Sequence, residues 1–70
     1  MEQDINKIAE TLQLKYNTML LSKEQTAQEI GSISQTSLDR LRQTGAISSK
    51  KVLGQIRFSV HEVARFIADA

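Results

Sequence analysis

The 70-residue chain contains no cysteine, no proline and only one histidine, His61. Without cysteine it can form neither a disulfide nor a thiolate metal site, a composition that suits a reducing cytosol. A single histidine leaves no group of side chains with metal-ligand spacing. We therefore expect no metal and no cofactor, and we expect the protein to work in the cytoplasm.

Long hydrophobic runs are missing as well, since none is longer than the three residues of Met19-Leu20-Leu21. Three residues can form neither a membrane-spanning helix nor the core of a signal peptide, so we expect no membrane partner. The sequence also lacks a Ser/His/Asp set, a recognisable pair of catalytic carboxylates and a glycine-rich phosphate loop. We therefore expect that the protein is not an enzyme.

Charge is distributed unevenly along the chain, although the net charge is only +1. Residues 1–33 hold five carboxylates and three lysines, which gives a net charge of −2. Residues 34–70 hold six cationic side chains and three carboxylates, which gives a net charge of +3. This asymmetry favours a nucleic-acid partner for the second half of the chain.

Hydrophobic spacing predicts an amphipathic helix over residues 2–16, followed by a brief strand at 19–21. The helix has four apolar side chains on one face: Ile5, Ile8, Leu12 and Tyr16. Ser22 and Gln25 match a capping box at the start of a second helix, which Gly31 ends.

A third helix is predicted to begin at the N-cap Ser34 and to run to Thr44, where Gly45 stops it. The hydrophobic period then changes to about two, which predicts a hairpin. A last helix begins after Ser59, with Glu62 in the reciprocal capping position. Its apolar stripe consists of Val60, Val63, Phe66 and Ile67.

The hairpin segment "KKVLGQIRF", residues 50–58, concentrates three cationic side chains in nine positions. If Val52, Ile56 and Phe58 share the core face, residues 53–55 form the connection and Lys51 lies opposite Arg57. Like charges directly opposite each other destabilise a sheet. Bound to phosphates, however, the same charges strengthen the affinity, because each neutralised phosphate releases counterions. Lys50 adds a third cation nearby. The alternative is that these cations only protect an exposed strand edge.

Three segments together resemble the excisionase and MerR-like winged-helix family of small DNA-binding proteins: "LSKEQTAQEIG", "SQTSLDRLRQTGAI" and "VLGQIRFSVHEVARFI". The resemblance implies a mainly α fold with a small β-hairpin, a winged helix-turn-helix over residues 19–70. Residues 1–18 would precede it as an N-terminal amphipathic helix. It also implies that the second helix of the motif enters the major groove and that the hairpin, as the wing, contacts the backbone or minor groove.

With Leu38 and Leu41 facing the core, the third predicted helix turns its polar side chains outward. Its outward face and the hairpin provide the candidate DNA contacts: Gln35, Thr36, Ser37, Arg40, Arg42, Gln43, Lys50, Lys51, Gln55 and Arg57. The alternative for each helix residue is a solvated polar surface. Asp39 also faces outward, and we expect it to pair with Arg42 or Arg40.

The leading hypothesis is a duplex-DNA-binding protein of phage, plasmid or bacterial origin. As in the family that it resembles, it would be an excisionase-like recombination factor or a small transcription regulator, working with a recombinase or the transcription machinery. The alternative is a protein-interaction module that does not bind DNA. The N-terminal helix would cover the domain's own core in a monomer, which we favour, or pair with a second copy.

Overall fold

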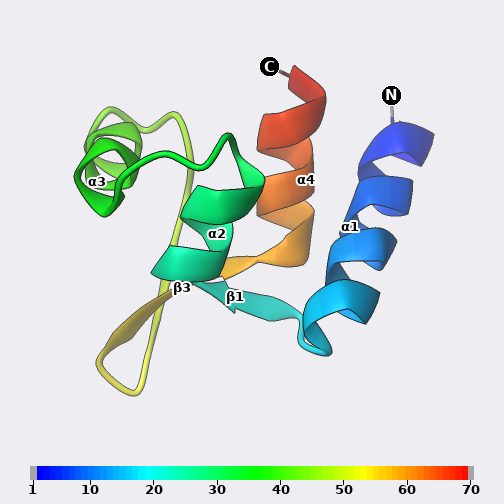
Figure 1. Ribbon diagram of the computed structural model, residues 1–70, viewed down its shortest axis with the longest axis horizontal. Helices are drawn as coiled ribbons and strands as arrows, with labels where there is room; N and C mark the ends of the chain where they lie inside the picture. The colour runs from blue at the N-terminus through cyan, green and yellow to red at the C-terminus, as the bar shows by residue number, and fades with distance from the viewer. Residues whose placement is uncertain (1, 70) are drawn as a thin grey trace.

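The computed structural model describes residues 2–69, and within them it has four helices and one three-stranded antiparallel sheet (Figure 1). In chain order the elements are α1 (Glu2–Tyr16), β1 (Leu20–Ser22), α2 (Lys23–Glu29), α3 (Gln35–Gln43), β2 (Lys50–Val52), β3 (Gln55–Ser59) and α4 (Val60–Asp69). The predicted fold class, mainly helical with a small amount of strand, is confirmed. Met1 and Ala70, the ends of the two predicted segments, lie outside the described residues. None of the helices within residues 2–69 is long and apolar enough to cross a bilayer.

The sheet has the strand order β1-β3-β2, so the brief first strand pairs with the second strand of the hairpin. Leu21 on β1 lies opposite Phe58 on β3, and both side chains are fully buried. Directly opposite residues share one face of a sheet, so this pair marks the face that covers the core. The first strand therefore extends the hairpin into a sheet.

The core lies between this sheet and the helices, and Leu38, Ile47 and Val63 are its other large, fully buried aliphatic side chains. Figure 1 shows α1 and α4 side by side on one side of the molecule, and α3 and the hairpin on the other. Leu12 of α1 is buried, and Ile8 packs against the same core. The apolar face of α1 is thus covered by its own chain.

Side-chain caps begin α2 and α3 as predicted. The Gln25 backbone N–H donates to Ser22 Oγ over 3.1 Å, and the Ser22 N–H donates to Gln25 Oε1 over 3.0 Å. Ser34 Oγ likewise accepts from the Ser37 N–H of α3 over 3.1 Å. These bonds satisfy amides that the helix itself leaves free, which fixes where each helix starts.

The prediction for the start of α4 is only half right. The Glu62 N–H donates to Ser59 Oγ over 3.1 Å, as expected of an N-cap. The Glu62 carboxylate, however, accepts from the Ser48 N–H over 2.8 Å and from Arg65 instead of returning to the cap residue. Arg65 gives this carboxylate two charge-assisted bonds, which are stronger than the single bond to the neutral Ser59 N–H that a capping box would provide.

The predicted hairpin register is wrong by one residue. Lys50 lies opposite Arg57, Lys51 opposite Ile56, and Val52 opposite Gln55. Only Leu53 and Gly54 form the connection, with φ angles of 52° and 81°. Two positive φ angles are typical of the tight turn whose twist matches the flanking strands, and this turn type sets the register. Val52 therefore leaves the core face and is 38% exposed.

Candidate nucleic-acid interface

The outer face of the sheet carries a row of polar side chains across its three strands. Lys50 on β2 lies opposite Arg57 on β3, which in turn lies opposite Ser22 on β1. Phe58 follows Arg57 and is fully buried, so the alternation of a strand turns Arg57 and its cross-strand partners away from the core. Two cations therefore meet directly on the outer face.

Gln55 orients one of these cations. The Arg57 Nη2 donates to Gln55 Oε1 over 2.7 Å along the same strand, so the two side chains share the outer face. Of the predicted hairpin residues, the structure brings together Lys50, Gln55 and Arg57. It separates Lys51 from them, because Lys51 pairs with Ile56 on the other face and is exposed beyond the core.

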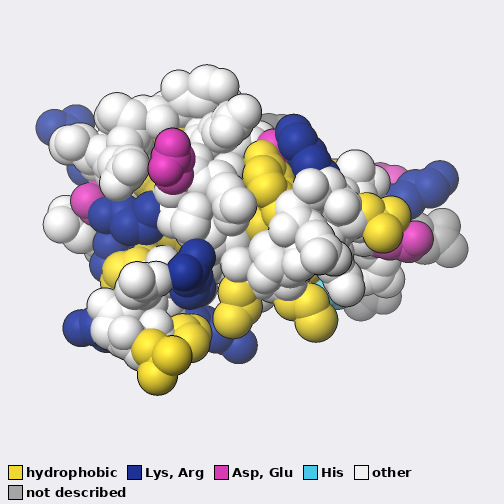
Figure 2. Space-filling model, turned by 60° about the horizontal axis from the view of Figure 1, so that its bottom comes forward, with side chains coloured by type: hydrophobic (Ala, Val, Ile, Leu, Met, Phe, Trp, Pro, Cys, Tyr) yellow, Lys and Arg dark blue, Asp and Glu magenta, His cyan; other side chains and the backbone are white. Residues whose placement is uncertain are grey.

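The hairpin cations keep their charge free of internal partners. None of the ion pairs within the described part of the chain involves Lys50, Lys51 or Arg57, nor Arg40 on α3. Figure 2 shows lysine and arginine side chains gathered around the hairpin, in the lower left of that view. This end of the molecule is therefore available to an anionic partner.

Helix α3 lies at the same end of the molecule as the hairpin (Figure 1). Leu38 is fully buried and Leu41 packs against the core, which fixes the rotation of the helix. The predicted contact residues on the opposite face are exposed: Gln35, Thr36, Ser37, Arg40 and Gln43. The Ser37 hydroxyl accepts from Ser34 Oγ over 3.1 Å, so it is engaged in the cap.

Arg42 differs from the other predicted α3 residues because it is drawn into an ion-pair cluster. Its Nη1 lies 2.7 Å from Asp39 Oδ1, as expected, and its Nε is buried without a hydrogen-bond partner. Lys23 of α2 reaches the same carboxylate, with Nζ 2.9 Å from Oδ1. The Lys23 ammonium, followed by Arg42, lowers the pKa of Asp39 below its ordinary value. One carboxylate thus joins α2 to α3 and neutralises part of the local positive charge.

Lys23 was not among the predicted site residues. The pairing joins residues sixteen positions apart on different helices, and no periodicity within one helix indicates it. A net-charge argument also counts Lys23 and Arg42 as available cations, whereas they share Asp39.

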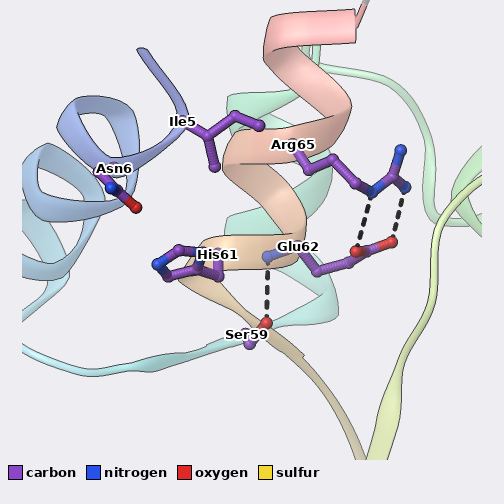
Figure 3. A pocket seen from close by; sticks show the side chains of 6 residues that line it. All are labelled: Ile5, Asn6, Ser59, His61, Glu62 and Arg65. Carbon is purple, nitrogen blue, oxygen red and sulfur yellow. Dashed lines mark hydrogen bonds and ion pairs between the residues drawn. The ribbon is translucent and has the colours of Figure 1, made fainter. Parts of the chain in front are cut away.

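A second ion-pair cluster holds the segment that leads from α3 to the hairpin (Figure 3). Arg65 Nε and Nη2 donate to the two oxygens of Glu62 over 3.0 and 2.7 Å. Arg65 Nη2 also donates to the Ala46 carbonyl over 3.0 Å, while the Glu62 carboxylate accepts from the Ser48 N–H. Arg65 first, and then Ser48, lowers the pKa of Glu62. Arg65 therefore positions the start of β2 and is not a free surface cation.

Beside this cluster is an open cleft of about 450 Å³ between α1 and α4. Its lining consists of Ile5, Asn6, Ser59, His61, Glu62 and Arg65. The two charged residues of the cleft already bond to each other, which leaves them little capacity for a ligand. Among residues 2–69, no three His, Asp or Glu side chains gather as they would around a metal ion.

Comparison with models of known protein families, with characterised proteins and with solved structures finds no match for this chain. Function must therefore be argued from the residues and geometry of the chain itself.

Proposed function

We propose that this protein binds double-stranded DNA as a winged helix-turn-helix, with α3 as the recognition helix and the β2–β3 hairpin as the wing. Lys50, Gln55 and Arg57 would contact the phosphate backbone. Gln35, Thr36, Arg40 and Gln43 would face the major groove, where glutamine pairs well with adenine and arginine with guanine. Arg42 would act indirectly, by orienting the Asp39 carboxylate that Lys23 of α2 also reaches.

The observation that carries this proposal is the Lys50–Arg57 pair. Two like charges directly opposite each other on a sheet reduce the stability of the isolated protein. No described carboxylate forms an ion pair with either side chain. The same pair increases the affinity for a polyanion, because each neutralised phosphate releases counterions.

The test is a fluorescence anisotropy titration of a labelled duplex at several salt concentrations. We expect binding that weakens steeply with salt. The Lys50→Ala/Arg57→Ala double variant should bind more weakly, and its slope of log K against log salt should be shallower by about 0.9 for each lost phosphate contact.

The matched control is Lys7→Ala, which removes an exposed cation from α1 on the other side of the molecule. It should leave the salt slope unchanged. Circular dichroism verifies that each variant folds. No binding by the wild-type protein at low salt, or an equal effect of the control and the double variant, would contradict the proposal.

A protein-interaction module is the second candidate, and the Asp39 cluster is the observation that favours it. This carboxylate occupies two cations next to α3 and places negative charge where a recognition helix approaches phosphates. A module of this class should be unaffected by heparin, whereas heparin should displace a DNA-binding protein from its partner.

In the proposed role the protein performs no chemistry. It would assist a recombinase or the transcription machinery by occupying and shaping its DNA site, in the cytoplasm of a bacterial cell. The two processes require the same interface, so the geometry favours neither.

A further inference from the structure

The tip of the hairpin has two features that are energetically unfavourable for the isolated protein. Leu53 is 100% exposed, and its backbone has a φ of 52°. This left-handed conformation is unfavourable for leucine, and asparagine, aspartate or glycine normally fills this turn position. Exposure of a large aliphatic side chain to water is unfavourable as well. A single exposed leucine is ordinary, as Leu14 shows, but an exposed leucine in a turn position that suits asparagine or glycine better points to a contact outside the chain.

Charge surrounds this apolar tip. Val52 precedes Leu53 and is 38% exposed, and the strands behind the tip carry Lys50, Lys51 and Arg57. Figure 2 shows hydrophobic side chains at the protruding end of the hairpin, with lysine and arginine side chains next to them. A partner that binds this tip must offer an apolar site for Leu53 and negative charge around that site for the flanking cations.

The minor groove of DNA meets both requirements. Its rims are phosphates and its floor gives access to the stacked bases, and leucine is one of the residues that proteins insert there between base pairs. An anionic membrane also combines these properties, but membrane affinity scales with buried apolar area, and a single exposed leucine with a partly exposed valine provides little.

We propose that Leu53 is a wedge that enters the minor groove between two base pairs and bends the duplex. This inference rests on the proposed function, because it assigns a ligand subsite to the tip of the proposed wing. Lys50 and Arg57 hold the flanking phosphates, and Leu53 separates the base step between them.

The test variant is Leu53→Asn, because asparagine suits the turn conformation and preserves the hairpin while removing the wedge. A duplex of about 25 base pairs carries a donor and an acceptor dye at its ends, and energy transfer reports the bend. A 2-aminopurine base in the site reports unstacking by its fluorescence. The wild-type protein should bend the duplex by about 20–90° and raise the 2-aminopurine signal.

Leu53→Asn should bind with several-fold lower affinity and lose both signals. The control Leu14→Gln removes a 76% exposed leucine from α1, and it should retain both. If wild type and Leu53→Asn bind equally and bend equally, or if neither bends the duplex, the wedge is refuted while DNA binding stands.

If the wild-type protein does not bind DNA at all, the proposed function fails first, and anisotropy detects this independently of the bend. Vesicles containing phosphatidylserine are titrated in parallel. Leucine-dependent binding to vesicles without bending of DNA would also refute the wedge.

Discussion

On α1, two leucines two positions apart lie in opposite environments. Leu12 is 3% exposed in the core, whereas Leu14 is 76% exposed. A helix turns about 100° per residue, so side chains two positions apart lie on nearly opposite faces. The free energy of burial is therefore concentrated on one side of the helix.

Replacement of Leu12 by alanine should lower the free energy of unfolding by about 2–5 kcal/mol, because it removes buried methyl groups and leaves a cavity. In a domain of this size that is a large part of the total stability. Leu14→Ala is the matched control and should change it by less than about 0.5 kcal/mol. Urea unfolding followed by circular dichroism measures both. Equal effects would mean that α1 does not pack on the core.

Single residues show where reading the sequence succeeds. The apolar spacing of α1, the Ser22 cap and the inward Leu38 are local properties, and all three are confirmed. The period of two assigned Val52 to the core face together with Ile56 and Phe58, yet Val52 lies on the outer face. An apolar side chain near a hairpin tip extends past the core, so its hydrophobicity does not reveal its face.

At the scale of elements, the hairpin shows how a turn determines the position of charge. The residues "VLGQI" fit a two-residue or a three-residue connection, and the choice moves every β2 side chain to the other face. The tight turn places Lys50, and not Lys51, opposite Arg57. The prediction that a lysine lies opposite Arg57 is confirmed, but the lysine is Lys50 and not Lys51.

This register predicts opposite effects of one substitution on folding and on binding. Lys50→Glu places a carboxylate opposite Arg57, and such cross-strand pairs contribute roughly 0.2–1 kcal/mol. The variant should therefore unfold at a higher urea concentration, and it should bind DNA more weakly than the wild-type protein. Urea unfolding and anisotropy measure the two effects.

Lys51→Glu is the control for this pair, since it makes the same change of charge opposite Ile56. It should weaken DNA binding less than Lys50→Glu does, because Lys51 lies on the other face of the hairpin, and it should not raise the free energy of unfolding. If Lys51→Glu raised the free energy of unfolding more than Lys50→Glu does, the observed register would be refuted.

For the molecule as a whole, three carboxylates join elements that are distant in the sequence. Glu29 of α2 accepts from Lys15 over 2.7 Å and from Tyr16, and so joins α2 to α1. Asp39 joins α3 to α2, and Glu62 joins α4 to the segment before β2. These links span thirteen to sixteen residues, so no helical or strand period in the sequence indicates them.

All three carboxyl groups have lowered pKa values. Lys15 and then Tyr16 lower the pKa of Glu29, Lys23 lowers that of Asp39, and Arg65 lowers that of Glu62. A group whose pKa is lower in the folded state stabilises the fold fully above its unfolded pKa. That contribution is lost as the pH falls through the folded value. Asp39 contributes least, because its carboxylate is the most exposed of the three and solvent screens its charge.

The protein should therefore keep its stability from pH 7 down to about 5, and lose it progressively once the pH falls below the unfolded glutamate value of 4.5. Glu29→Gln and Glu62→Gln should each lower the free energy of unfolding at pH 7 by up to about 1 kcal/mol, because the partners Lys15 and Arg65 are more than a third exposed and solvent screens both pairs. Both variants should also depend less on pH between 5 and 3, since the titrating group is gone. Urea unfolding at a series of pH values measures this.

Glu10→Gln is the control, because Glu10 forms no ion pair within the described residues. It should follow the wild-type profile. If Glu29→Gln and Glu62→Gln also follow it, the acid transition has another origin. If only one of them departs from it, that link alone carries the pH dependence: α1 against α2 for Glu29, or α4 against the segment before β2 for Glu62. The two variants thus separate the attachment of the N-terminal helix from the positioning of the hairpin, and only loss of the second should also weaken DNA binding.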